Sequence, residues 1–82
     1  MQETKCYACN SELGFKPWDQ GLASFEICHF CGIQFGYDDF AGGDEQKRKR
    51  IYEKWNIVWL ENGKKPLSKD QRLEVIKSSM QN

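Results

Sequence analysis

The chain has 82 residues, which is the size of one small domain. It carries twelve basic and twelve acidic residues, and this zero net charge argues against a dedicated nucleic-acid-binding domain, because such domains are usually strongly basic. The charges are unevenly distributed: residues 1–43 hold two Lys against six Asp and Glu, whereas residues 44–82 hold ten Lys and Arg against six Asp and Glu. The halves therefore carry −4 and +4, and we expect them to attract each other.

The sequence shows neither a signal-peptide pattern nor a membrane-spanning pattern. Residues 1–5 lack the apolar core of a signal peptide, and no run approaches the roughly 18 apolar residues that a membrane span requires. We therefore expect a cytoplasmic protein with no membrane partner, in a compartment where thiols stay reduced.

Four cysteines form the most specific motif of the chain, with the spacing C-x2-C-x18-C-x2-C. They are Cys6, Cys9, Cys28 and Cys31. Each pair can reach one ion from a single tight turn, and two pairs complete the tetrahedral thiolate shell that Zn²⁺ favours in structural sites. Asn10 and Gly32 follow the pairs; both residue types tolerate a positive φ, which lets backbone N–H groups point at sulfur.

Two other interpretations of the cysteines are a pair of disulfides and a thioredoxin-like redox motif. Disulfides are typical of secreted chains, and the redox motif needs a βαβ unit around one C-x-x-C. We favour one structural Zn²⁺ ion, whose four protein ligands leave no position for substrate. Because so short a chain buries a small core, we expect the N-terminal half to unfold without the metal.

Residues 5–40 predict a zinc ribbon with two zinc knuckles and short antiparallel strands. Leu13 and Phe15 alternate with small or polar neighbours, and residues 22–27 and 33–37 also repeat with period two. We therefore expect three strands, with a turn at residues 19–21 after Pro17.

Residues 44–61 predict a first helix. Asp44 suits the N-cap, and Asn62-Gly63 suits the C-terminal end. At about 100° per residue, the apolar residues of this helix fall on one arc, which we expect to pack against the ribbon. It contains Ile51, Tyr52, Trp55, Val58 and Trp59.

Residues 69–79 predict a second helix after Pro66, with Ser68 and Gln71 as a capping box. Its apolar stripe is Leu73, Ile76 and Met80. We expect this stripe to cover Ile57 and Leu60, which point away from the ribbon. The whole sequence thus predicts a single domain, residues 1–82, of small α+β class: a four-cysteine zinc ribbon followed by two C-terminal α-helices.

Several side chains outside the cysteine motif are candidates for a partner-binding surface. They are Trp18, Phe30, Asp38, Asp39, Lys47, Arg50 and Lys54. The two aromatic residues lie at a turn and a knuckle tip, the acidic pair ends a predicted strand, and the three cations share one helical stripe. His29, inside the second knuckle, is expected to face solvent.

The run from Ser24 to Asp39 resembles the cysteine-rich CPCC-type family of small bacterial proteins, above all in Glu26-Ile27-Cys28-x-x-Cys31 followed by an acidic pair. The resemblance covers about residues 5–43, although the first knuckle lacks the proline between its cysteines. It implies the same four cysteines as zinc ligands. It also suggests an immunity or antitoxin role beside a secreted toxin.

The sequence favours a non-enzymatic, zinc-containing protein-interaction module. The alternative is a nucleic-acid-binding zinc ribbon, in which Lys47, Arg50 and Lys54 contact phosphates and Trp18 or Phe30 stacks on bases. An enzyme is disfavoured, because the metal shell is closed and His29 has no evident catalytic partner.

Overall fold

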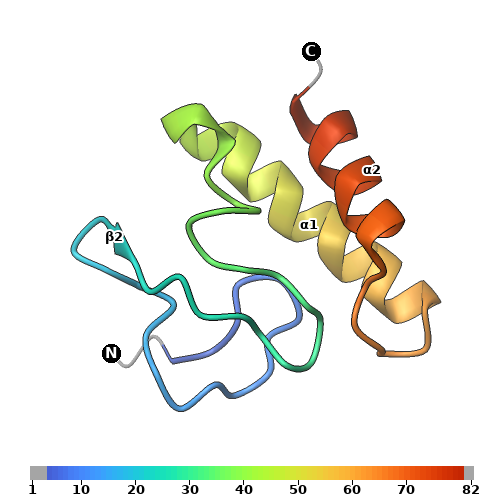
Figure 1. Ribbon diagram of the computed structural model, residues 1–82, viewed down its shortest axis with the longest axis horizontal. Helices are drawn as coiled ribbons and strands as arrows, with labels where there is room; N and C mark the ends of the chain where they lie inside the picture. Colours follow the sequence, from blue (N-terminus) through green and yellow to red (C-terminus); the bar gives the residue numbers. More distant parts are fainter. Residues whose placement is uncertain (1–3, 81–82) are drawn as a thin grey trace.

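The computed structural model describes residues 4–80 (Figure 1). Its elements are β1 (Trp18–Asp19), β2 (Leu22–Ala23), the short 3-10 turn η1 (Ala41–Gly43), α1 (Glu45–Glu61) and α2 (Lys69–Met80). The predicted fold class is confirmed: a short antiparallel hairpin and a four-cysteine cluster precede two helices. Figure 1 shows α1 and α2 side by side, with residues 5–40, here called the ribbon, on the other side of α1. Within residues 4–80, neither helix is long and apolar enough to cross a membrane.

The two knuckles of the ribbon share one backbone pattern. In each, the first cysteine, Cys6 or Cys28, donates its N–H to the carbonyl five residues on, at 2.9 and 2.8 Å. Its own carbonyl accepts from the N–H four residues on, which belongs to Asn10 or Gly32. These two residues have φ of 66° and 85°, so the predicted left-handed positions are confirmed.

The three predicted strands are wrong in extent. The described ribbon contains only the two-residue strands β1 and β2 and two isolated bridges, Lys5 with Glu12 and Ile27 with Gln34. Each predicted strand contains one residue with positive φ: Gly14 at 81°, Phe25 at 61° and Gly36 at 94°. A residue in this region turns the chain out of the extended conformation, so alternating hydrophobicity does not become a continuous ladder.

The predicted turn at residues 19–21 is confirmed as a tight hairpin. Trp18 pairs with Ala23 and Asp19 with Leu22. The two loop residues, Gln20 and Gly21, both have positive φ, 53° and 81°. This combination is a type I′ turn, whose twist matches that of the antiparallel strands it joins.

Helix α1 forms as the sequence predicts. The Asp44 carboxylate accepts hydrogen bonds from the N–H groups of Gln46 and Lys47, at 3.0 and 3.2 Å, which confirms the N-cap. The apolar arc also lies as expected: its centre is buried and its edges, Tyr52 and Val58, pack partly against the core. The buried residues of α1 are Ile51, Trp55 and Trp59.

The second helix caps as predicted but packs on a different face. Ser68 and Gln71 exchange the two hydrogen bonds of a capping box, at 2.8 and 3.2 Å. However, α2 buries Val75 and Ser79, and Ile57 and Leu60 of α1 remain 55% and 51% exposed. The predicted cover by Leu73, Ile76 and Met80 is therefore wrong: Leu73 and Met80 are exposed, and only Ile76 packs partly against the core.

A polar contact and small side chains account for this choice of face. Lys54 of α1 donates from Nζ to the carbonyl and the hydroxyl of Ser78, at 3.2 and 3.1 Å. A cation that reaches the last turn of a helix also meets the negative end of its dipole. The neighbouring Ser79 is small, and helices approach more closely where the contacting side chains are small.

The Gly36 position provides a test of the ribbon geometry. A Cβ there would lie 2.5 Å from Cβ of Ala23 and 2.8 Å from the Phe25 ring, whereas a Cβ at Gly14 would meet nothing within 4 Å. Both glycines have φ near +81° to +94°. Gly36→Ala should lower the free energy of unfolding by about 1–3 kcal/mol more than Gly14→Ala, since only the former overpacks. Urea denaturation of the metal-loaded proteins measures this, and equal losses would contradict the contact.

Candidate metal centre

The four cysteine sulfurs converge on one point between the knuckles. All four Sγ atoms lie within 4.8 Å of one another, and the Cys6–Cys31 and Cys9–Cys28 separations are both 3.7 Å. A tetrahedral ion with metal–sulfur bonds of about 2.3 Å has sulfur–sulfur edges of about 3.8 Å. A disulfide would need about 2.05 Å, and all four cysteines are free. The geometry therefore fits one metal ion held by four thiolates.

The surroundings of the cluster are those of a structural site. All four cysteines are buried. The Ala8 N–H donates to Cys6 Sγ at 3.4 Å, which is the kind of backbone contact to sulfur that the sequence predicts. The Cys9 thiol contacts the Ser11 hydroxyl at 3.2 Å. Four buried thiol groups around one point match the ligand set of a tetrahedral Zn²⁺ site.

The four thiols change one another's acidity because they lie so close together. The hydrogen bond with Cys31 lowers the pKa of Cys28 to about 7, and hydrogen bonding with Cys28 lowers the pKa of Cys9. Hydrogen bonding with Cys28 also raises the pKa values of Cys6 and Cys31, and burial adds to this rise. Thiolates this close repel one another, so a bound dication is required before all four can lose their protons.

Residues 45–80 contact the second knuckle through hydrogen bonds to its backbone carbonyls. The indole of Trp55 donates to the Cys31 carbonyl at 3.0 Å, and that of Trp59 donates to the Phe30 carbonyl at 2.7 Å. The Leu67 N–H, in the link between α1 and α2, donates to the same Cys31 carbonyl at 3.1 Å. The apolar face of α1 is thus also a set of polar contacts that orient two residues of one knuckle.

The acidic pair is buried and does not form an exposed turn, which differs from the surface expected from the sequence. Asp38 is 7% exposed and Asp39 is 0% exposed. Asp38 accepts the Gln34 N–H at 2.8 Å. Asp39 accepts from the Gly36 N–H, the Trp18 indole and the Tyr52 hydroxyl, at 2.5, 2.8 and 2.5 Å. Because a carboxylate can satisfy several donors at once, Asp39 joins the hairpin, the segment that follows the second knuckle, and α1.

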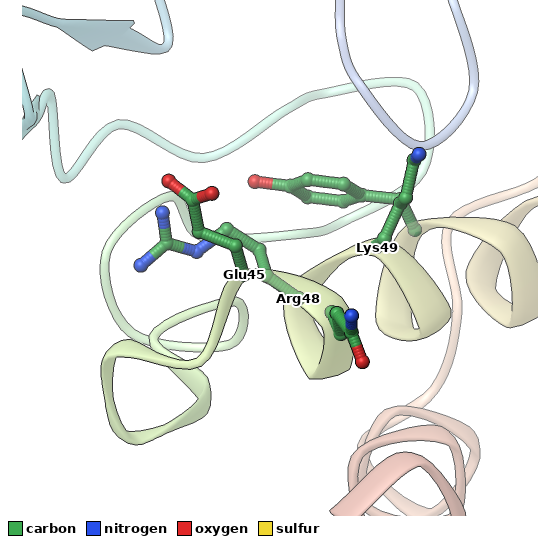
Figure 2. A pocket seen from close by; sticks show the side chains of 5 residues that line it. Glu45, Arg48 and Lys49 are labelled. Atoms are coloured by element: carbon green, nitrogen blue, oxygen red, sulfur yellow. The ribbon is translucent and has the colours of Figure 1, made fainter.

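Arg48 also contacts this group of residues, and it was not among the candidates predicted from the sequence. Its Nε donates to the Asp39 carbonyl at 2.9 Å, and its guanidinium lies 4.2 Å from the centre of the Trp18 ring. Figure 2 shows Arg48 on the first turns of α1 with Glu45 and Lys49, beside a shallow pocket of about 370 Å³. A sequence signal for these contacts was Tyr52, because a tyrosine on an apolar arc needs a partner for its hydroxyl.

Of the remaining candidate residues, Trp18 contacts the acidic pair through its hydrogen bond to Asp39. Trp18 is half-buried beneath Arg48, and Lys54 is engaged with Ser78. Phe30 and Arg50 are exposed, and Lys47 is half-buried. The predicted exposure of His29 is confirmed.

Comparison with protein-family models, with curated proteins and with solved structures finds no match to this chain. The similarity to the CPCC-type family therefore stays a prediction from residues 5–43. The metal centre rests on the sulfur geometry alone.

Metal removal should expose the tryptophans of α1. Chelation should release one zinc ion per chain and shift the tryptophan emission to longer wavelengths, because the Trp55 and Trp59 indoles lose the knuckle carbonyls they contact. Cys28→Ser should weaken zinc binding by about 100-fold or more, since it removes a ligand. His29→Ala, an exposed neighbour, is the control and should keep full affinity. Equal losses in both variants would indicate a different ligand set.

The hydrogen bonds that Asp39 accepts from Trp18, Gly36 and Tyr52 should add to the free energy of unfolding. Asp39→Asn replaces one acceptor with an NH₂ group that faces N–H and O–H donors, so it should cost about 1–3 kcal/mol of unfolding free energy. Asp19→Asn, at an exposed position of the hairpin, should cost less than about 0.5 kcal/mol. Chemical denaturation at fixed zinc concentration compares the two variants, and similar values would show that these hydrogen bonds contribute little.

Proposed function

We propose that this chain is a non-enzymatic protein-binding module whose fold is held by one structural Zn²⁺ ion. The observation that carries the proposal is the exposure of Ile57 and Leu60 on one face of α1, with Leu73 exposed separately on α2. Ile57 and Leu60 on α1, and Leu73 on α2, are each more than half exposed after the helices have packed. Exposed aliphatic side chains of this kind, when they gather on one face, are typical of surfaces that bind another protein.

The metal centre supports a structural role for the ion. Four thiolates complete a tetrahedral zinc shell, so the ion has no ligand position left for a reacting group. The pocket beside the start of α1 is lined by Glu45, Gln46, Arg48, Lys49 and Tyr52, none of which is an activated nucleophile. Burial raises the pKa of the Tyr52 phenol, and the hydrogen bond that its hydroxyl donates to the buried Asp39 adds to this rise. These features favour binding over catalysis.

Nucleic-acid binding has weaker support. Of the three cations assigned to phosphates, Lys54 donates to Ser78 and is therefore committed to the contact between the helices. Trp18, one of the two aromatic residues assigned to base stacking, already stacks on Arg48 and donates to Asp39. An immunity or antitoxin role is one specific form of protein binding that fits the same surface.

Site-specific photocrosslinking tests this function. A photoreactive residue at position 57 or 60 should yield an adduct with one discrete protein in the native cell, and the adduct should survive nuclease treatment. The same residue at position 16 or 19, exposed in the ribbon, is the control and should give little adduct. Equal labelling at all four positions, or labelling of nucleic acid, would contradict the proposal.

A further inference from the structure

A groove opens between α2 and the segment that follows the second knuckle. Its volume is about 460 Å³. The segment contributes Gln34, Tyr37 and Asp38, and α2 contributes Lys69, Arg72, Leu73 and Ile76. This volume lies within the range of sites that accept a few side chains of a ligand.

The α2 side of the groove has a simple charge pattern. Residues 69, 72, 73 and 76 recur at i, i+3, i+4 and i+7, so they share one face of the helix. Asp70 and Glu74, the two acids of α2, lie more than about 90° from the centre of that face. The groove therefore meets the two cations of this face, Lys69 and Arg72, without the two acids of α2.

Neither cation forms an ion pair within residues 4–80. The ion pair found within residues 4–80 is Lys16 with Asp19, so Lys69 and Arg72 have no carboxylate within 4.0 Å. Asp38 lies in the same groove, but its carboxylate accepts the Gln34 N–H and is almost fully buried. Burial raises the pKa of Asp38 and the charge of Arg72 opposes this rise. Asp38 thus offsets at most one of the two positive charges.

The apolar part of the groove is incompletely covered. Tyr37 is 75% exposed and Leu73 is 56% exposed, on opposite walls. Ile76, which also lines the groove, is half-buried and packs against the core. An apolar side chain placed here would bury surface on all three residues, which favours its transfer from water.

We propose that this groove binds an acidic segment of a partner protein. An aliphatic or aromatic side chain of the segment contacts Tyr37, Leu73 and Ile76. Neighbouring carboxylates pair with Lys69 and Arg72. The inference rests on the proposed protein-binding function and specifies the chemistry of the partner.

The lining of the groove favours a carboxylate-bearing peptide over a nucleic acid. Apolar and aromatic side chains make up much of the lining, and they offer little to a phosphodiester chain. The buried Asp38 would repel a polyanion whose phosphates entered the groove. An acidic peptide can instead place its carboxylates at the outer cations and its apolar side chain beside Asp38.

A displayed library of random 12-residue peptides tests the inference, with the zinc-loaded full chain as bait. The enriched peptides should carry an aliphatic or aromatic residue within about four positions of two or more Asp or Glu, which is the reach of one helical turn. Affinity of the best peptide is then measured by calorimetry. Arg72→Glu and Leu73→Ser should each weaken it by about 10-fold or more.

Lys77→Glu is the matched control, because it makes the same charge change at an exposed position of α2 away from the groove. It should change the affinity by less than about 2-fold, since exposed charges outside a binding site contribute little. Zinc content and helical circular dichroism must be unchanged in all variants, so that a loss of binding is not a loss of fold.

Three results would overturn the inference. The first is enrichment of peptides without acidic residues. The second is a peptide that still binds the Arg72→Glu and Leu73→Ser variants but does not bind the double variant Ile57→Ser, Leu60→Ser. In that case the chain would bind proteins, but at a site other than the groove. The third is no enrichment at all, in which case the crosslinks from positions 57 and 60 still decide the proposed function separately.

Discussion

The close approach of four sulfur atoms is the constraint on which this molecule depends. Thiols held 3.7 Å apart in a buried site cannot all ionise unless a cation is present. Their geometry suits a tetrahedral metal ion, which supplies that positive charge. The ribbon has little regular secondary structure to replace that interaction. Its strands β1 and β2 are two residues long, and its other ladder contacts are single bridges. Metal coordination thus takes over the role that a β-sheet has in a larger domain.

The two knuckles are alike in backbone but not in environment. The second is held from outside by Trp55, Trp59 and Leu67, which donate to the carbonyls of Phe30 and Cys31. This asymmetry joins the helices to the metal centre through one knuckle. It also explains the apolar face of α1, where tryptophan supplies both the buried surface and an N–H donor at the required position.

Asp39 illustrates how a buried acid can be accommodated in a small core without an ion pair to a side chain. Its carboxylate receives three neutral donors, and the nearby Arg48 contacts the backbone carbonyl and the Trp18 ring. The donors come from the hairpin, the segment that follows the second knuckle, and α1. A single short side chain therefore joins parts of the chain that the metal does not hold together.

The amino-acid sequence by itself determined the four-cysteine cluster, both helix starts and the apolar face of α1, because each depends on spacing within a few residues or on a specific metal geometry. It did not determine the strands: Phe25 has a left-handed backbone that its residue type does not predict, and Gly14 and Gly36 use the positive φ that glycine permits. Only the tertiary structure decided that Asp39 is buried and that Leu73 is exposed. Both outcomes depend on donors and surfaces from distant segments, and a single helical or strand period carries no information about them.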